Sequence, residues 1–131
     1  MQLVDLSSFV RFGLVGTVGF VVDAGVLQAL VSLADWGPIE ARAVSFPVAV
    51  LATWLLNRNI TFRAAIDVPA HRSLARYVTV SLAGASMNFI VYTSLVFASS
   101  VMAAHPVVPL AIASGIALIV NYLGSKFFAF R

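Results

Sequence analysis

The stretch FGLVGTVGFVVDAGVLQALVSLA, from Phe12 to Ala34, contains a single ionisable residue, Asp23. An α-helix of this length, at about 1.5 Å per residue, is roughly 34 Å long and matches a hydrocarbon core about 30 Å thick. The stretch lacks the polar and apolar alternation of strands, and backbone groups in lipid must be hydrogen-bonded within a helix or a closed barrel. It therefore predicts a membrane-spanning helix.

The rest of the chain has the same character. Of its 131 residues, 61% are hydrophobic and 10% are charged, and the mean hydropathy is +1.01, whereas a typical soluble domain has about 25% charged residues. We predict an all-α integral membrane fold, one domain over residues 1–131, with four transmembrane helices. The spans are expected at about residues 12–34, 43–62, 77–100 and 107–128.

Basic residues are distributed unequally between the two predicted sides of the membrane. Arg42 stands alone on one side, and seven basic residues share the other: Arg11, Arg58, Arg63, Arg72, Arg76, Lys126 and Arg131. Because cytoplasmic loops carry the excess of Lys and Arg, both termini and the loop Ala64–Ser73 should be cytoplasmic, with Gly37 and His105 outside. This juxtamembrane bias accounts for the pI near 10.0, so no nucleic-acid partner is expected.

The two halves of the chain align with each other. A displacement of 65 residues places RFGLVGTVGFVVD, from Arg11, over RYVTVSLAGASMN, from Arg76. A displacement of 68 places TWLLNRNITFR, from Thr53, over NYLGSKFFAFR, from Asn121. We predict two parallel helical-hairpin repeats, 11–63 and 76–131, related by a pseudo-two-fold axis along the membrane normal.

Small and polar residues recur at helical spacing on all four predicted helices. The stripes comprise Gly16, Gly19 and Asp23; Ser81, Gly84 and Asn88; Ser45, Ala49, Thr53 and Asn57; and Ala113, Ala117, Asn121 and Ser125. Small residues allow close helix packing, which is the expected role of the glycines and Ser81. A cation follows the two longer stripes, at Arg58 and Lys126, so these helix ends are candidate cradles for an anionic, polar headgroup.

Asp23 is expected near the middle of the membrane, twelve residues after Arg11. An acid at that depth costs at least about 2.5–3.5 kcal/mol on insertion scales and usually faces a partner or a polar cavity. It could bind a cation, carry a proton or accept sugar hydroxyls, and a purely structural hydrogen bond is the alternative. The chain has no cysteine and two scattered histidines, so neither a metal site nor another cofactor is expected.

The segments RFGLVGTVGFVVD, TWLLNRNITF, RYVTVSLAGASMN and NYLGSKFFAF together resemble the GtrA-like family over nearly the whole chain. Both second helices of the predicted repeats end in a pattern similar to that family's Asn-aromatic-x-x-Asn/Ser-Arg/Lys-x-x-x-Phe motif. The chain departs from the motif at Thr53, where the family often has asparagine.

The resemblance implies a bacterial cytoplasmic (inner) membrane protein of envelope polysaccharide synthesis that flips a polyprenyl-phosphate-linked sugar and catalyses no reaction. A polyprenyl-phosphate glycosyltransferase is a candidate partner, and a narrow four-helix bundle favours a homo-oligomer. On this hypothesis the phosphate is bound by Arg58, Lys126, Arg11 and Arg76. The sugar meets Thr53, Asn57, Asn121 and Ser125, and the deeper route is lined by Asp23 and Asn88.

Two other functions fit parts of the sequence. A proton-coupled exporter similar to the small multidrug resistance proteins also has four spans and a lone acid in its first helix, although such proteins usually have weak charge bias. A noncatalytic membrane partner of a glycosyltransferase would need helix surfaces but no polar pathway. No phosphate-binding Gly-Lys loop or catalytic triad pattern is present in the sequence, which disfavours an enzyme.

Overall fold

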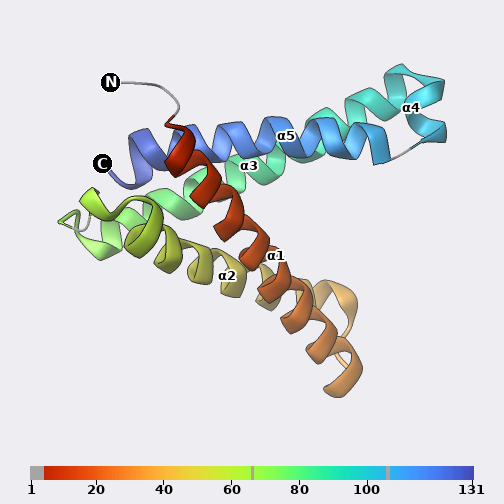
Figure 1. Cartoon of the computed structure of the whole chain (residues 1–131). Coiled ribbons are helices and arrows are strands. Elements are labelled where there is room, and N and C mark those ends of the chain that lie inside the picture. Colours follow the sequence, from red (N-terminus) through yellow and green to blue (C-terminus); the bar gives the residue numbers. More distant parts are fainter. Residues whose placement is uncertain (1–4, 66, 106) are drawn as a thin grey trace. The chain divides into compact units, whose positions relative to one another are not determined.

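The computed structural model describes residues 5–65, 67–105 and 107–131, and every regular element among them is helical. The α-helices in chain order are α1 (Leu6–Leu33), α2 (Pro38–Leu56), α3 (Ala70–Ala98), α4 (Ser100–Ala104) and α5 (Val107–Gly124) (Figure 1). A π-helical turn continues α2 (η1, Asn57–Thr61) and another continues α5 (η3, Ser125–Ala129), while η2 (Arg63–Ala65) is a short 3₁₀ turn. The predicted all-α fold class is confirmed.

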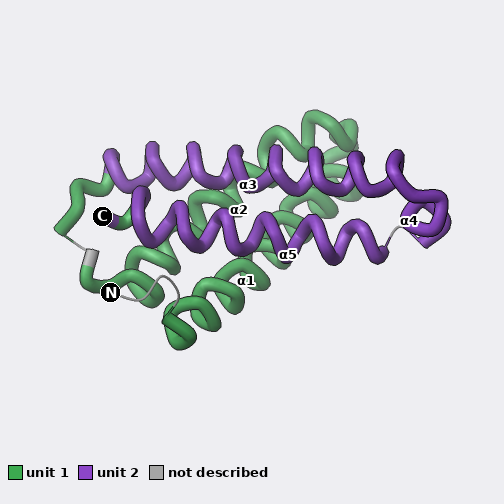
Figure 2. Tube along the Cα trace, turned by 90° about the horizontal axis from the view of Figure 1, so that it is seen from above, with its two compact units in different colours: residues 1–70, 130 green, residues 71–129, 131 purple. Residues whose placement is uncertain are grey.

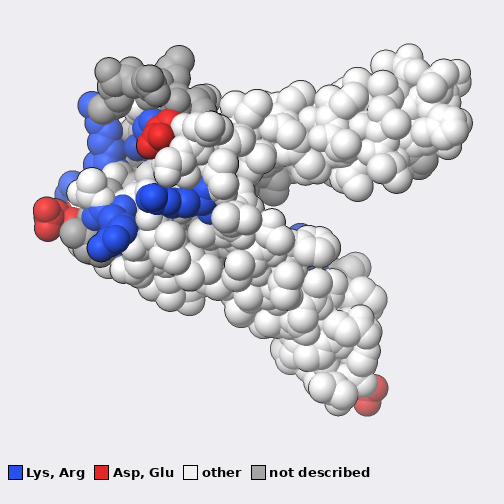
Figure 3. All heavy atoms as spheres, in the orientation of Figure 1, with Lys and Arg blue, Asp and Glu red and all other residues white. Residues whose placement is uncertain are grey.

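Four helical stretches are long and apolar enough to cross a membrane. They are Leu6–Leu33, Pro38–Thr61, Ala70–Ala98 and Val107–Ala129. Only 11% to 28% of their most apolar windows is buried inside the protein, so most of this apolar surface is available to lipid. On the face drawn in Figure 3, uncharged surface covers most of the helices, and charged side chains gather mainly where helices end. The chain is a multi-pass membrane protein with four candidate spans.

The first three spanning helices begin earlier than predicted. They start at Leu6, Pro38 and Ala70, whereas the apolar segments were expected from residues 12, 43 and 77. Charged residues interrupt an apolar run without interrupting a helix, because the first helical turns can extend into the polar membrane interface. At one of these starts, the Asp5 carboxylate accepts a hydrogen bond from the Ser7 backbone N–H at 3.2 Å.

The turn-favouring residues Gly37 and Pro38, and further on Pro106 and Pro109, predict breaks between helices, and these breaks have different outcomes at the starts of α2 and α5. Gly37 and Pro38 mark the start of α2, as expected. Pro109 lies inside the first turn of α5, where a missing N–H removes no hydrogen bond from the helix. Pro106, also expected to mark this break, lies outside the described residues.

The chain divides into two compact units (Figure 2). Unit 1 extends to Ala70 and includes Phe130, and unit 2 comprises His71–Ala129 and Arg131. Helices α1 and α2 form an antiparallel hairpin in unit 1, and α3 and α5 lie side by side in unit 2 (Figure 2). The division falls between the two predicted repeats, whereas their two-fold relation and the single-domain assignment stay predictions.

Each hairpin is packed at a glycine on its first spanning helix. A Cβ atom added at Gly19 would overlap the Thr53 methyl group, and one added at Gly84 would overlap the Asn121 carboxamide. The close packing expected at these two glycines is therefore present. In contrast, a Cβ at Gly16 would meet no atom of the protein within 4 Å, so Gly16 is not a packing residue of its hairpin.

Candidate polar sites in the two hairpins

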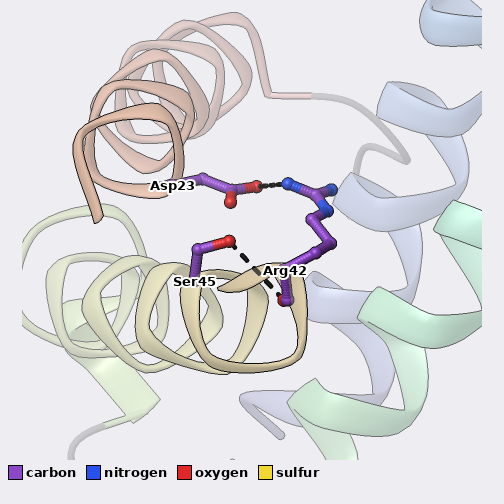
Figure 4. A network of polar contacts seen from close by, with 3 residues as sticks. All are labelled: Asp23, Arg42 and Ser45. Carbon is purple, nitrogen blue, oxygen red and sulfur yellow. Dashed lines mark hydrogen bonds and ion pairs between the residues drawn. The ribbon is translucent and has the colours of Figure 1, made fainter. Parts of the chain in front are cut away.

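Unit 1 carries a charge well inside a span at Asp23, which forms an ion pair with Arg42 (Figure 4). Asp23 lies on α1, ten residues or about 15 Å of helix before Leu33, and Arg42 lies on α2, four residues or about 6 Å after Pro38. The Asp23 side chain is 15% exposed and the Arg42 side chain is 54% exposed. The pair therefore joins a largely enclosed carboxylate to a guanidinium that remains accessible.

The surroundings of this pair are partly polar. The Arg42 guanidinium lies 5.5 Å from the centre of the Phe46 ring. Ser45 is fully buried, and its hydroxyl, which donates to the Arg42 carbonyl at 3.5 Å, lies on the side of α2 that faces Asp23 (Figure 4). Among the described residues, Oδ1 of Asp23 is buried and has no hydrogen-bond partner. One carboxylate oxygen is thus available as an acceptor.

Sequence reasoning placed Asp23 at depth but did not identify Arg42 as its partner. The two residues lie at different distances from the turn that joins α1 to α2, and the long arginine side chain spans the difference. Arg42 carries the only cation on its predicted side of the membrane, and that isolation is the signal by which the sequence could have identified it.

The polar stripe of α2 is satisfied largely by its own helix. The Thr53 hydroxyl lies 3.0 Å from each of the carbonyl oxygens of Ala49 and Val50. Asn57 is 1% exposed and its side-chain oxygen accepts a hydrogen bond from the Thr61 hydroxyl at 2.8 Å. Any ligand that contacts Thr53 or Asn57 must therefore compete with bonds inside the protein.

The matching stripe of α5 in unit 2 is different. Oδ1 of Asn121 and the Ser125 hydroxyl oxygen are buried, and neither has a hydrogen-bond partner within the described part of the chain. Nearer the other end of the hairpin, the Asn88 amide donates to the Ser114 hydroxyl at 3.4 Å, a long hydrogen bond. Unit 2 therefore holds two enclosed polar atoms whose hydrogen-bonding capacity is unused, a rare and costly condition inside a protein.

The cations at the ends of the second helices lie against aromatic rings. The Arg58 guanidinium is 5.7 Å from the Trp54 ring centre and donates to the Val68 carbonyl at 2.8 Å. The Lys126 ammonium is 5.8 Å from the Tyr122 ring centre. Both are cation–π distances, so these charges are positioned by neighbouring side chains.

Two further predicted phosphate ligands have different environments. Arg76 of unit 2 donates to the carbonyl oxygens of Phe128 and Arg131 at 3.2 and 3.1 Å, and so fixes the end of η3. Arg11 of unit 1 is exposed. Arg76 thus has a structural role that the sequence did not reveal.

Both second helices change to π-helical geometry at the polar residue next to the cation. The two π segments, Asn57–Thr61 and Ser125–Ala129, occupy positions separated by the same displacement of 68 residues that aligns the predicted repeats. Single π-helical turns inside helices occur frequently at functional sites. This feature has no signature in the hydropathy of the chain.

The predicted site residues are divided equally between the units. Unit 1 contains Arg11, Asp23, Thr53, Asn57 and Arg58, and unit 2 contains Arg76, Asn88, Asn121, Ser125 and Lys126. Within the described residues, no group of three or more Asp, Glu or His side chains is placed to hold a metal ion.

Comparison with protein families gives a match that covers nearly the whole chain. The family model described as "GtrA/DPMS, transmembrane domain" matches residues 11–130. The chain belongs to the GtrA/DPMS transmembrane-domain family. A comparison with curated protein sequences finds no significant match.

Membership of the GtrA/DPMS family associates the chain with membrane proteins related to polysaccharide synthesis. The GtrA family is generally composed of non-catalytic membrane proteins. All ten predicted site residues lie within the matched range.

Proposed function

We propose that this GtrA/DPMS-family chain translocates a polyprenyl-phosphate-linked sugar across a bacterial cytoplasmic membrane and forms or breaks no covalent bond. The unpartnered, buried polar atoms of Asn121 and Ser125 carry this proposal. Buried polar atoms are normally hydrogen-bonded, and leaving one unsatisfied costs about 1–3 kcal/mol. A sugar hydroxyl supplies the missing partners, since it both donates and accepts hydrogen bonds.

The cationic helix ends suit the phosphate of the same ligand. Lys126 directly follows Ser125, and Arg58 directly follows Asn57, so each hairpin places a cation beside a polar residue. The lipid tail stays against the apolar outer surface of the helices, most of which is not buried within the protein. The polar head and the apolar tail thus meet surfaces of matching chemistry.

Outward movement of the phosphate needs no nucleotide. An interior-negative membrane potential favours the outward transfer of one negative charge by about 2.3 kcal/mol per 100 mV. This direction assumes cytoplasmic termini, which cysteine labelling tests: Gly37→Cys and His105→Cys should react with an impermeant reagent from outside only. Labelling of Gly37→Cys from the cytoplasmic side alone would reverse the proposed orientation.

Two assembly features belong to the same proposal. A four-span chain is narrow, so the sugar path is completed by a second copy of the chain in a homo-oligomer. A polyprenyl-phosphate glycosyltransferase supplies or uses the lipid-linked sugar beside it. Cross-linking in native membranes, followed by mass measurement of the products, tests both partners.

The decisive experiment uses purified chain reconstituted into vesicles with defined polyprenyl-phosphate sugars, and it measures their accessibility on each leaflet. Ser125→Ala and Asn121→Leu should reduce translocation at least about tenfold without lowering thermal stability, because each removes a buried polar atom that lacks a partner. Thr79→Ala is the matched control, since Thr79 is exposed and its hydroxyl donates to the Ala75 carbonyl of its own helix.

Two results would contradict the proposal. The first is wild-type protein that fails to redistribute any of the lipid-linked sugars between leaflets. The second is Ser125→Ala and Asn121→Leu proteins that transport as well as the Thr79→Ala control. Transport driven by an imposed pH gradient, and abolished by Asp23→Asn, would instead favour the proton-coupled exporter.

A further inference from the structure

We propose that Arg42 is a further phosphate-binding residue of the translocation path, at the opposite end of its span from Arg58, and that Asp23 is the anion it holds until the lipid phosphate displaces it. This inference rests on the proposed function. Arg42 lies in the first turns of α2. Arg58 is the second residue of η1, which continues the same helix. Arg42 and Arg58 are separated by sixteen positions, or about 24 Å of helix, so the two guanidinium-bearing positions mark opposite ends of one span.

The chemistry of Arg42 suits an exchange of partners. A guanidinium offers five N–H donors in a planar fork that fits carboxylate and phosphate oxygens equally well. The ion pair uses Nη1 of Arg42 and Oδ2 of Asp23, while Oδ1 of Asp23 has no partner among the described residues. The pair is thus a single-point contact, and a phosphate with several oxygens can make the bidentate contact that the carboxylate does not.

The exposure of the two side chains determines which of them can change partner. Arg42 is 54% exposed, and its position about 6 Å from the start of α2 lets its long side chain reach the membrane interface. Asp23 is 15% exposed and lies about 15 Å of helix from the end of α1. The guanidinium is therefore accessible to an arriving anion, whereas the carboxylate is fixed in place.

The exchange gives each residue a task during transport. When phosphate binds Arg42, Asp23 is released and both of its oxygens can accept sugar hydroxyls in the protein interior. When Asp23 returns to Arg42, it competes with the phosphate and promotes release of the lipid. No proton transfer or covalent step is required, and the number of charges is the same in the two arrangements.

The test isolates this site from the cations at the other helix ends. We would place the full chain, carrying Arg58→Gln and Lys126→Gln, in nanodiscs of phosphatidylcholine and titrate it with citronellyl phosphate, using citronellol as the uncharged control. In this background, Asp23→Asn should bind citronellyl phosphate about tenfold more tightly, because the competing carboxylate is gone and a charged hydrogen bond is worth at least that factor. Arg42→Gln should bind at least about tenfold more weakly, and the double variant should behave like Arg42→Gln.

Either of two results would overturn the inference: equal binding by Asp23→Asn and its parent, or retention of phosphate-dependent binding by Arg42→Gln. If Arg42→Gln does not fold, Arg42→Lys replaces it, and the comparison of Asp23→Asn with its parent decides the question alone. Because this experiment measures binding, a negative result does not contradict translocation by the unmodified chain. Conversely, if the chain does not translocate the lipid-linked sugar, a positive binding result can still be interpreted.

Discussion

Removal of Arg42 should destabilise the protein more than removal of the charge on Asp23, although both changes break the same ion pair. Arg42→Gln leaves a carboxylate that is 15% exposed and about 15 Å of helix from the nearer end of α1. Asp23→Asn leaves a guanidinium that is 54% exposed and close to the start of α2, where it can extend to the interface. Only Arg42→Gln therefore leaves an enclosed charge without its partner.

The expected magnitudes follow from these positions. Loss of one partner from a fully buried ion pair costs about 3–5 kcal/mol, and an unpaired acid at the membrane centre costs about 2.5–3.5 kcal/mol on insertion scales. Since Arg42 is half exposed, we expect about 2–3 kcal/mol for Arg42→Gln. For Asp23→Asn we expect about 1 kcal/mol, because the amide retains one acceptor and adds donors. The double variant has neither charge, so its loss of stability should be smaller than that of Arg42→Gln alone.

A double-mutant cycle in bicelles measures these differences. The free energy of unfolding would be determined for the parent chain, both single variants and Asp23→Asn/Arg42→Gln. We expect a coupling energy of about 1–2 kcal/mol, in the range that contacting residues show. A coupling energy near zero, or a larger loss for Asp23→Asn than for Arg42→Gln, would refute the reasoning from exposure and depth.

Two other substitutions test contacts within the separate units. Gly84→Ala should cost about 1–3 kcal/mol of stability and reduce transport, because the added methyl group would displace the Asn121 carboxamide. Gly16→Ala is the control: its methyl group would meet open space, so thermal unfolding should not change. Arg58→Gln should increase the rate of limited proteolysis in the loop before α3 about fivefold, because that loop loses the hydrogen bond from Arg58 to the Val68 carbonyl. An unchanged rate would show that this hydrogen bond does not hold the loop.

The fold class was predictable because a bilayer imposes a length and a polarity that few sequences satisfy by accident. The four apolar segments specified four spanning helices, and all four are present. The helix starts were less predictable, since Arg11, Arg42 and Arg76 end an apolar run but continue a helix. The relation between the two hairpins, which the displaced sequence alignment suggests, stays a prediction.

The candidate site was predictable as far as helical periodicity extends. The fourfold spacing of Ser45, Ala49 and Asn57 predicted one face of α2 and of η1, which continues it, and all three residues are buried. The partners of individual polar atoms were not predictable, because they depend on side-chain length and on the register between helices. For this reason Thr53 and Asn121 were predicted from the sequence to have the same role in contacting the sugar. Of these two residues, only Asn121 has a buried atom without a partner.

The contrast between Asp23 and its aligned residue Asn88 bears on why the chain carries an ion pair inside a span at all. Asn88 forms a neutral contact with Ser114, so a hairpin of this family can be built without charge at that position. Replacement of a buried ion pair by well-packed neutral residues is often neutral or stabilising, so packing alone gives no reason to keep Asp23 and Arg42. The pair offers instead two charges that can separate and recombine, which a neutral contact cannot do. An anionic ligand is the partner that would use this property, and the effect of Asp23→Asn on phosphate binding therefore tests the reason for the charge as well as its location.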